Sequence, residues 1–360
     1  MGAFGILPAM KFIETVYTKL QRHPKRIVFP EGTEPRVLHA AAEFVKLKLG
    51  APILLGKRDE IRNLAEREGV NLTRVGIIDP VTAADMPLFS QRLQKLQRYR
   101  NLGPGEAENF LLNPNYFAAM MIQCGQADGL VGGVSGYAGS LLRPLFQLVK
   151  PLPDVSFISS CMLMALKDTR FGENGVLFFA DCAVIPEPTV AQLGQIGVQA
   201  GKLCGQLTGS RPRVAFLSFS SKGSSRHTAT ERIAAAAAQA RKEAETEEID
   251  MEIDGELQAD TALLPDLAAL KAPGSMVAGR ANVLIFPDLN SGNIAVKLVE
   301  HLAGAETYGQ ILLGLSKPCA DLSRGATVET IVGAAAIVGL QAIAYRQLYP
   351  VGSSEEDTAV

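Results

Sequence analysis

The chain has 360 residues, 47% of them hydrophobic, which is enough for two domains that each bury a core. Its 35 lysines and arginines are balanced by 37 aspartates and glutamates, and the net charge of −2 excludes the broad basic surface that nucleic acid or an anionic membrane attracts. The five cysteines and four histidines show neither disulfide nor metal-ligand spacing, so we expect no metal site and a cytoplasmic location.

Expected strands and helices alternate along most of the chain. We expect strands at residues 26–32 and 51–56, each followed by an amphipathic helix, at residues 34–50 (ended by Gly50) and 58–69. Further apolar strands are expected at residues 129–133, 175–184, 213–220, 251–256, 282–289 and 309–318, and a long apolar helix at residues 331–348. This alternation predicts an α/β fold with mostly parallel sheets, in which ligands bind beyond the carboxyl ends of the strands. Pro151 and Pro153 predict a domain boundary.

The first polar segment suited to a ligand, residues 129–144, joins a strand to a helix through five glycines. Glycine lets backbone approach a ligand closely, and Arg143 near its end offers a guanidinium that can grip a phosphate with two hydrogen bonds. Ser135 and Tyr137 add hydroxyl groups, and we count them with Arg143 as candidate substrate-binding residues. A tight turn that ends in a surface arginine explains the same residues equally well.

Two later strand ends carry similar polar clusters. Ser221 and Lys222 belong to a serine-rich loop at residues 217–228 that suits a phosphate-bearing ligand, with a polar, helix-capping connection as an equal alternative. Asp288 and Asn293 follow another strand and are also candidate binding residues, although helix capping alone explains them. The acidic run at residues 254–260 lacks the histidine or third oxygen ligand that a metal site needs.

The last cluster places Asp321, Ser323 and Arg324 just before the long apolar helix. Free backbone N–H groups and the positive end of a helix favour an anion at such a turn. A solvated loop with a helix cap is the alternative. Together the clusters predict an α/β protein that binds a small phosphorylated or acidic ligand.

In this order, the segments resemble the phosphate acetyltransferase (phosphotransacetylase) family of phosphate acyltransferases. The most specific stretches are LSFSSKGSSRH (217–227), DGELQAD (254–260), ANVLIFPDLNSGNIAVKL (281–298) and KPCADLSRGA (317–326). The resemblance implies reversible acetyl transfer between coenzyme A (CoA) and inorganic phosphate. The CoA thiol attacks acetyl phosphate directly in a ternary complex, and the reaction needs no metal and no tightly bound cofactor.

The resemblance also implies an architecture and a set of partners. It implies two α/β domains with mostly parallel sheets and an active cleft between them. Residues 1–150 plus 310–360 form the first domain, which the C-terminal helices complete, and residues 151–309 form the second. The implied partners are acetyl-CoA or CoA, acetyl phosphate or phosphate, and a second copy of the chain in a homodimer, with no nucleic acid and no membrane.

Three site residues carry over directly from the family pattern. Ser323 would polarise the thioester, and Arg324 and Arg143 would hold the phosphate. Thr330 stands where the family carries the aspartate that acts as a base. Glu329, one residue earlier, is therefore the candidate base, with a helix-capping role as the alternative.

Other positions depart from the family pattern and leave alternatives open. Gln97 stands where the family has a second arginine, and Arg98 and Arg100 are the nearby candidates to replace it. Ala138 and Val296 alter the expected walls of the cleft. We expect an acetyltransferase. The alternatives are an enzyme for propionyl or butyryl groups and a non-catalytic sensor of acetyl-CoA or acetyl phosphate.

Overall fold

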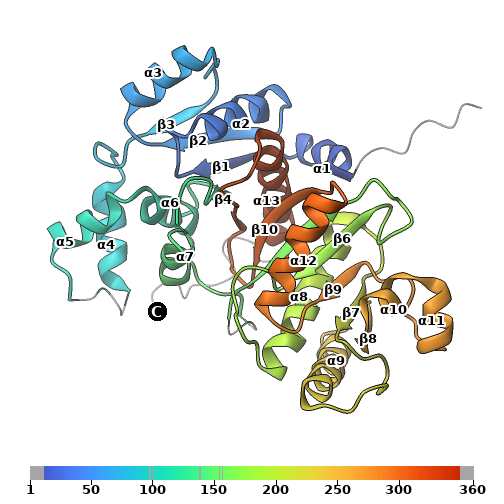
Figure 1. Ribbon diagram of the computed structural model, residues 1–360. Helices are drawn as coiled ribbons and strands as arrows, with labels where there is room; N and C mark the ends of the chain where they lie inside the picture. Colours follow the sequence, from blue (N-terminus) through green and yellow to red (C-terminus); the bar gives the residue numbers. More distant parts are fainter. Residues whose placement is uncertain are drawn as a thin grey trace, which may run out of the picture.

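The computed structural model describes residues 12–96, 99, 101–137, 139–153, 155 and 157–348. In this part of the chain, eleven strands form one sheet in the order β3-β2-β1-β4-β11-β10-β5-β6-β9-β7-β8, and helices lie on both of its faces (Figure 1). The strands form two groups that meet where β11 pairs with β10.

The first half of the sheet is entirely parallel. It contains β3 (Gly76–Ile78), β2 (Gly50–Leu55), β1 (Lys25–Phe29), β4 (Gly129–Gly132) and β11 (Cys319–Asp321). Its helices are α1 (Phe12–Gln21), α2 (Pro35–Lys46), α3 (Arg58–Glu68), α4 (Met86–Lys95), α5 (Pro104–Leu111), α6 (Pro114–Gln123), α7 (Leu142–Leu148) and α13 (Val328–Leu348). The strand β11 and the helix α13 return from the far end of the chain to complete this half.

The second half begins with antiparallel strands and continues with parallel ones. The strands β10 (Glu306–Leu313), β5 (Ser159–Ala165) and β6 (Val176–Ala180) pair antiparallel. Beyond them, β9 (Val283–Ile285), β7 (Arg213–Leu217) and β8 (Glu252–Leu257) are parallel to β6. The helices of this half are α8 (Val190–Thr208), α9 (Thr228–Thr246), α10 (Ala259–Leu263), α11 (Pro265–Lys271) and α12 (Leu289–Leu302).

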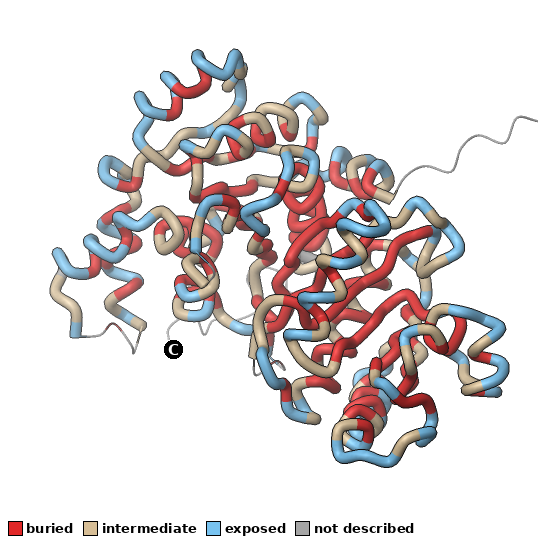
Figure 2. Tube along the Cα trace, viewed as in Figure 1, coloured by how far each residue is buried: buried red, intermediate tan, exposed pale blue. Residues whose placement is uncertain are grey.

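The two faces of the sheet are covered differently, because successive strand residues point to opposite faces. On one face, a continuous core joins the strands to α1, α2, α3, α8, α9 and α13. On the other face, α4 to α7 cover the first half and α10 to α12 cover the second, as two separate cores. Figure 2 shows the central strands as mostly buried. On this second face, the central strands β11, β10 and β5 lie between the two groups of helices.

The α/β fold with a mostly parallel sheet is confirmed, with two kinds of local correction. Gly50 does not end α2, which stops at Lys46; it begins β2, where a Cβ atom would lie 1.9 Å from the carbonyl oxygen of Lys25. The strands β3, β5 and β11 were not predicted. The sequence of β5, SSCMLMA, has no β-branched residue, so its strand propensity is weak. The domain boundaries stay a prediction.

The helix α13 is the long apolar helix expected before the C-terminus. By length and composition alone, Val328–Tyr345 could cross a membrane, with a mean hydropathy of 1.6, but 67% of this window is buried inside the protein. It packs against α1, α2, β4 and β10. Its apolar surface is therefore explained by the core it forms.

Candidate active site

Two polar loops meet where the parallel strands β4 and β11 end. Gly132 pairs with Asp321 in the register of these strands, so the two chains leave the sheet side by side. The amide of Leu322 donates a hydrogen bond to the carbonyl oxygen of Gly132, with an N–O distance of 2.7 Å. The glycine-rich loop after β4 and the turn before α13, which the sequence analysis treated separately, therefore form one structure.

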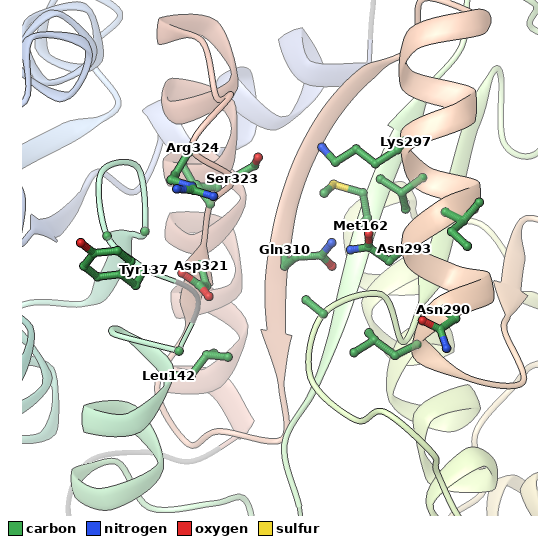
Figure 3. A pocket seen from close by; sticks show the side chains of 18 residues that line it. Tyr137, Leu142, Met162, Asn290, Asn293, Lys297, Gln310, Asp321, Ser323 and Arg324 are labelled. Atoms are coloured by element: carbon green, nitrogen blue, oxygen red, sulfur yellow. The ribbon is translucent and has the colours of Figure 1, made fainter.

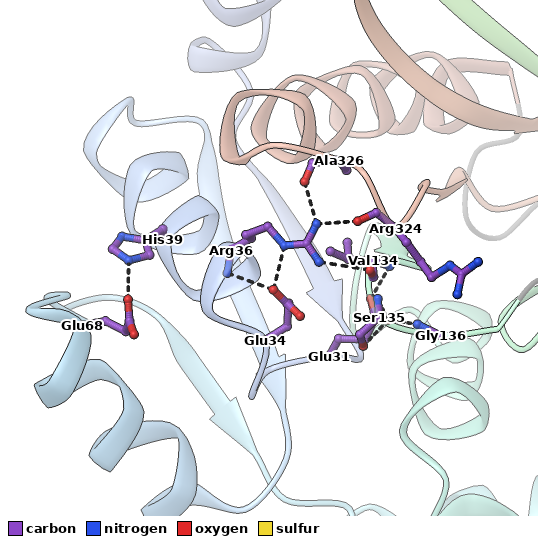
Figure 4. A network of polar contacts seen from close by, with 10 residues as sticks. All are labelled: Glu31, Glu34, Arg36, His39, Glu68, Val134, Ser135, Gly136, Arg324 and Ala326. Atoms are coloured by element: carbon purple, nitrogen blue, oxygen red, sulfur yellow. Dashed lines mark hydrogen bonds and ion pairs between the residues drawn. The ribbon is translucent and has the colours of Figure 1, made fainter. Parts of the chain in front are cut away.

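The carboxylate of Glu31, at the end of the neighbouring strand β1, holds the glycine-rich loop (Figure 4). It accepts hydrogen bonds from the backbone amides of Val134 (2.9 Å), Ser135 (2.7 Å) and Gly136 (3.1 Å). The hydroxyl of Ser135 donates a further bond to the same carboxylate at 2.8 Å. The Ser135 side chain thus has a partner within the protein, and this loop is fixed before any ligand binds.

The guanidinium of Arg36, in the first turn of α2, holds the other loop (Figure 4). It donates to the carbonyl oxygens of Arg324 at 2.7 Å and Ala326 at 2.9 Å. It also donates to the carbonyl oxygen of Val134 at 3.2 Å and to the carboxylate of Glu34 at 2.8 Å. A single side chain therefore links the turn before α13 to the glycine-rich loop.

These two loops form one wall of a cavity of about 590 Å³, and α12 forms the opposite wall (Figure 3). We call it the α7–α12 pocket. It lies over the central strands that helices leave uncovered. Its lining residues are Gly133, Gly136, Tyr137, Gly139, Leu142, Met162, Ala183, Leu289, Asn290, Asn293, Ile294, Val296, Lys297, Gln310, Asp321, Leu322, Ser323 and Arg324.

The pocket carries two basic side chains and a half-buried carboxyl group. Arg324 and Lys297 lie on opposite walls, and Lys297 extends from α12 toward the wall that carries Arg324 (Figure 3). The guanidinium of Arg324 makes no hydrogen bond with the described residues, whereas Lys297 pairs with Glu300 at 2.8 Å. Burial, together with repulsion from Glu31, raises the pKa of Asp321 to about 7. The pocket therefore suits an anion bound beside a group that can exchange a proton near neutral pH.

Four of the predicted site residues line the α7–α12 pocket: Tyr137, Asn293, Ser323 and Arg324. The Ser323 side chain is exposed, and its hydroxyl accepts a hydrogen bond from the amide of Gly325 at 3.3 Å. Asn293 donates to the carbonyl oxygen of Cys182 at 3.2 Å. Tyr137 is 86% exposed at the mouth of the pocket. Segments far apart in the sequence thus come together at this pocket, and the roles of the four residues stay predictions.

Arg143 and Glu329 lie near the pocket without lining it. Arg143 is exposed in the first turn of α7, next to Leu142, which does line the pocket. Glu329 is exposed in the first turn of α13. Hydrogen bonds from its own amide and from Thr327 lower the pKa of Glu329, which makes its carboxylate a weaker base. Both assignments stay predictions.

The other candidates lie farther along the sheet. Lys222 forms an ion pair with Asp254, and the Ser221 hydroxyl donates to Thr261 at 3.0 Å, so both contact β8 and the segment after it. Asp288 caps α12 by accepting a hydrogen bond from the amide of Ser291 at 2.8 Å. The binding roles of these three residues stay predictions. The candidates Arg98 and Arg100 lie outside the described residues, as do Gln97 and Ala138, so their roles stay predictions too.

The sequence analysis missed several residues that line the pocket. Lys297 stands four residues after Asn293, so helical spacing places it on the same face, and that signal was available. Gln310 lies on β10 and Met162 on β5, and these two strands pair although they are far apart in the sequence. The sequence alone gives no sign of that pairing. Asp321 was noted in its turn but was not assigned a role. Within the described residues, no three His, Cys, Asp or Glu side chains are grouped as metal ligands.

Comparison with known proteins connects this site to a family. Residues 11–339 match the family model described as phosphate acetyl/butaryl transferase. A phosphate acetyltransferase from Thermoanaerobacterium thermosaccharolyticum is 43% identical over 333 residues, which are 92% of this chain and 100% of that protein. The chain belongs to this family.

Other members of the phosphate acetyl/butaryl transferase family match equally widely. A phosphate acetyltransferase from Acetivibrio thermocellus is 39% identical and covers 92% of this chain and 98% of its own length. The crystal structure of a phosphotransacetylase from Streptococcus pyogenes superposes with a TM-score of 0.84 at 36% identity, over 92% of this chain and 98% of that one. These findings confirm the predicted family, and they confirm that the chain is an enzyme of the acyltransferase class.

Proposed function

We propose that this acyltransferase transfers an acetyl group reversibly between CoA and inorganic phosphate in the α7–α12 pocket. The observation that carries the proposal is the position of the Arg324 guanidinium, which makes no hydrogen bond with the described residues. It lies beside Ser323 and opposite Lys297, over a floor that contains Asp321 (Figure 3). Two positive charges in one cavity favour a phosphate group. The curated relatives are named phosphate acetyltransferases, which favours acetyl over propionyl or butyryl transfer and over a non-catalytic sensor.

The residues near the pocket suggest how the phosphate end is held. Arg324 and Lys297 bind the phosphate, and the Ser323 hydroxyl donates a hydrogen bond near the thioester. Arg143, one residue beyond the pocket wall at Leu142, is proposed as a further phosphate ligand that reaches in from the mouth. Charged donors that face the phosphate stabilise the charge that develops on it as it departs.

The surroundings of the pocket favour direct transfer over a covalent acyl-enzyme. One thiol beside these elements is that of Cys182, whose carbonyl oxygen accepts a hydrogen bond from Asn293. Burial raises the pKa of the Cys182 thiol well above its usual value, so this thiol is a poor nucleophile. CoA supplies the attacking sulfur as a substrate, and no tightly bound cofactor is proposed.

A steady-state assay that follows thioester formation from CoA and acetyl phosphate tests this function. Propionyl and butyryl phosphate, assayed in parallel, test the acyl preference, which we expect to favour acetyl. Arg324→Ala should lower kcat/KM by roughly 10²-fold or more, because it removes a charged donor from the transition state. Arg62→Ala, which removes an exposed guanidinium on α3 outside the pocket, is the matched control and should leave kcat/KM within about threefold. Turnover by Arg324→Ala equal to that of the unchanged protein would refute the assigned pocket.

We also propose that the chain forms a homodimer in the cytoplasm and that it divides into domains at the boundaries predicted above. The homodimer is supported by an exposed apolar stripe on α12, where Ile294, Leu298 and Leu302 are spaced by four residues. The cytoplasmic location is supported by five free cysteines, four of them buried. Light scattering should give the mass of a dimer, and the double variant Leu298→Glu, Leu302→Glu should give that of a monomer. A monomeric mass before any substitution would refute the proposed homodimer.

A further inference from the structure

The floor of the α7–α12 pocket contains two polar side chains on neighbouring strands. Ile311 pairs with Ala320 between β10 and β11, so Gln310 and Asp321 occupy the next facing positions. Ile311 and Ala320 point into the core shared with α13. Because successive residues alternate, Gln310 and Asp321 point to the opposite face, where both line the pocket (Figure 3).

Neither side chain is satisfied within the protein. Gln310 is only 9% exposed, and its Oε1 atom has no hydrogen-bond partner among the described residues. The Asp321 carboxyl group makes no hydrogen bond or ion pair with them either, and it lies against the backbone of Gly133, where a Cβ atom would come within 2.2 Å of its Oδ1 atom. Buried polar atoms normally have partners, so a ligand that fills this pocket is expected to supply one to Gln310. The same ligand would meet the half-buried carboxyl group of Asp321 beside it.

We propose that Asp321 is the group that accepts the proton of the CoA thiol, and that Gln310 accepts a hydrogen bond from the nearest amide N–H of CoA. This inference rests on the proposed acetyl transfer in the same pocket. The thiol and that amide of CoA are separated by two methylene groups. That span is close to the ~5 Å between side chains that face each other on neighbouring strands, so one ligand can meet both residues.

The charged and titratable groups around Asp321 come from several elements near the pocket floor. Glu31 lies at the end of β1, Arg324 follows in the same turn, and Lys297 faces the floor from α12, with the Tyr137 hydroxyl in the loop after β4. Burial and Glu31 raise the pKa of Asp321 to about 7, so the group can accept a proton and release it again near neutral pH.

The proposed step exchanges one bond at the acetyl carbonyl carbon for another. As the S–H proton passes to the Asp321 carboxylate, the sulfur of CoA attacks the carbonyl carbon of acetyl phosphate and a C–S bond forms. The bond from that carbon to the phosphate oxygen then breaks, and the phosphate leaves toward Arg324 and Lys297. Asp321 returns its proton to the departing phosphate, directly or through water, which gives acetyl-CoA and hydrogen phosphate. The reverse reaction uses the same groups in the opposite order.

The contrast with the other carboxylate candidate is clear in the structure. Glu329 is exposed, does not line the pocket, and has a pKa lowered by hydrogen bonds. Thr330 donates its backbone amide to Thr327 at 3.2 Å and carries no ionisable group. Asp321 is therefore the carboxyl group among these that combines access to the pocket with a pKa suited to a base.

The pH dependence of kcat/KM in matched variants tests the proposal. The unchanged protein should show an ascending limb with a midpoint near pH 7, where Asp321 loses its proton. Asp321→Asn should lose that limb and lower kcat by about 10²-fold or more, while KM for acetyl phosphate stays within about threefold. Asp266→Asn makes the same chemical change at an exposed position on α11, outside the pocket, and should keep both the limb and kcat. Glu329→Gln, measured beside it, tests the other candidate base.

A second variant tests the position of the thiol arm. Gln310→Leu removes an unpartnered buried acceptor, so it should leave the unfolding free energy unchanged or higher while KM for CoA rises about tenfold. KM for acetyl phosphate should not change. A KM for CoA that stays constant would refute the role of Gln310.

The possible outcomes for the base are distinct. If the unchanged protein turns over and Asp321→Asn retains the limb, Asp321 is not the base, although the acetyltransferase function stands. Loss of the limb in Glu329→Gln would transfer the role to Glu329. If the folded, unchanged protein shows no turnover, the proposed function and this inference fail together.

Discussion

Replacement of Arg36 tests whether the two active-site loops must be held together from outside the pocket. Arg36→Met keeps the length of the side chain but removes three hydrogen bonds to the carbonyl oxygens of Val134, Arg324 and Ala326, as well as the ion pair with Glu34. Charged hydrogen bonds contribute about 1.5–3 kcal/mol each when buried. The Arg36 side chain is 34% exposed, so water replaces part of them, and we expect a loss of only about 2–3 kcal/mol in the free energy of unfolding.

The kinetic effect of the same substitution follows from its position. Arg36 does not line the pocket, so its removal should displace Arg324 without changing the chemistry of any group there. We expect kcat/KM to fall by about 10- to 100-fold, mostly through a higher KM on the phosphate side. Arg36→Lys keeps the charge, but a lysine ammonium lacks the planar guanidinium that reaches three carbonyl groups at once. Its free energy of unfolding and its kcat/KM should therefore lie between those of Arg36→Met and those of the unchanged protein.

Urea unfolding and steady-state kinetics on the same preparations give the two quantities. Unchanged kinetics with a stability loss of about 2–3 kcal/mol would show that Arg36 only supports the fold, and the reasoning about loop position would be refuted. Unchanged stability would show that water replaces all of its hydrogen bonds.

Three further predictions concern the pocket. Gly133→Ala should abolish most activity, because the new Cβ atom would lie 2.2 Å from the Oδ1 atom of Asp321, at a residue with a φ of +92°. Gly139→Ala is the matched control for backbone strain, since Gly139 has a φ of +85° but nothing within 4 Å of its Cβ position. Equal activity of the two variants would contradict the prediction. Between about pH 4 and its folded pKa of about 7, Asp321 is protonated in the folded protein and ionised in the unfolded chain, so the free energy of unfolding falls as pH rises through this range. Relative to the unchanged protein, Asp321→Asn should therefore gain up to roughly 4 kcal/mol in the free energy of unfolding between about pH 4 and pH 8. Urea unfolding at both pH values measures this gain, and an equal difference at the two would contradict it. Lys297→Met should raise KM for phosphate about tenfold in the assay that starts from acetyl-CoA, and an unchanged KM would remove Lys297 from the phosphate site.

The sequence predicted the fold where local patterns carried it. The runs at residues 26–32 and 213–220 became β1 and β7, and the expected helix at residues 331–348 is the greater part of α13. It failed where tertiary pairing alone defines a strand. Strand β11 has only three residues, and β5 lacks β-branched residues, so both are identified as strands only through their partners.

Helix packing shows a similar limit. The alanine-rich stretch of α9 has the composition of an exposed helix, yet Ala236, Ala237 and Ala240 are fully buried, and α9 packs against α8. Gly194 on α8 faces this surface, and a Cβ atom there would lie 3.4 Å from the carbonyl oxygen of Ala236. Small residues allow the two helices to approach closely, and the sequence of one helix alone does not show that a partner is present.

The site was predictable to the extent that it follows strand ends. Ser323, Arg324 and Tyr137 follow β11 and β4, and the rule that ligands bind beyond strand ends brought them together correctly. The same rule did not separate them from Ser221 and Lys222, which follow another strand. The order of the strands in the sheet decides which strand ends lie beside the pocket, and the sequence does not show that order.

The most direct test of the account is the rate of thioester formation from CoA and acetyl phosphate, measured with the unchanged protein and with Arg324→Ala at saturating CoA. We predict turnover by the unchanged protein and a loss of roughly 10²-fold or more in kcat/KM for the variant, with the fold of both verified by circular dichroism. Equal turnover by the two proteins, or none by the folded unchanged protein, would contradict the assignment of acetyl transfer to the α7–α12 pocket.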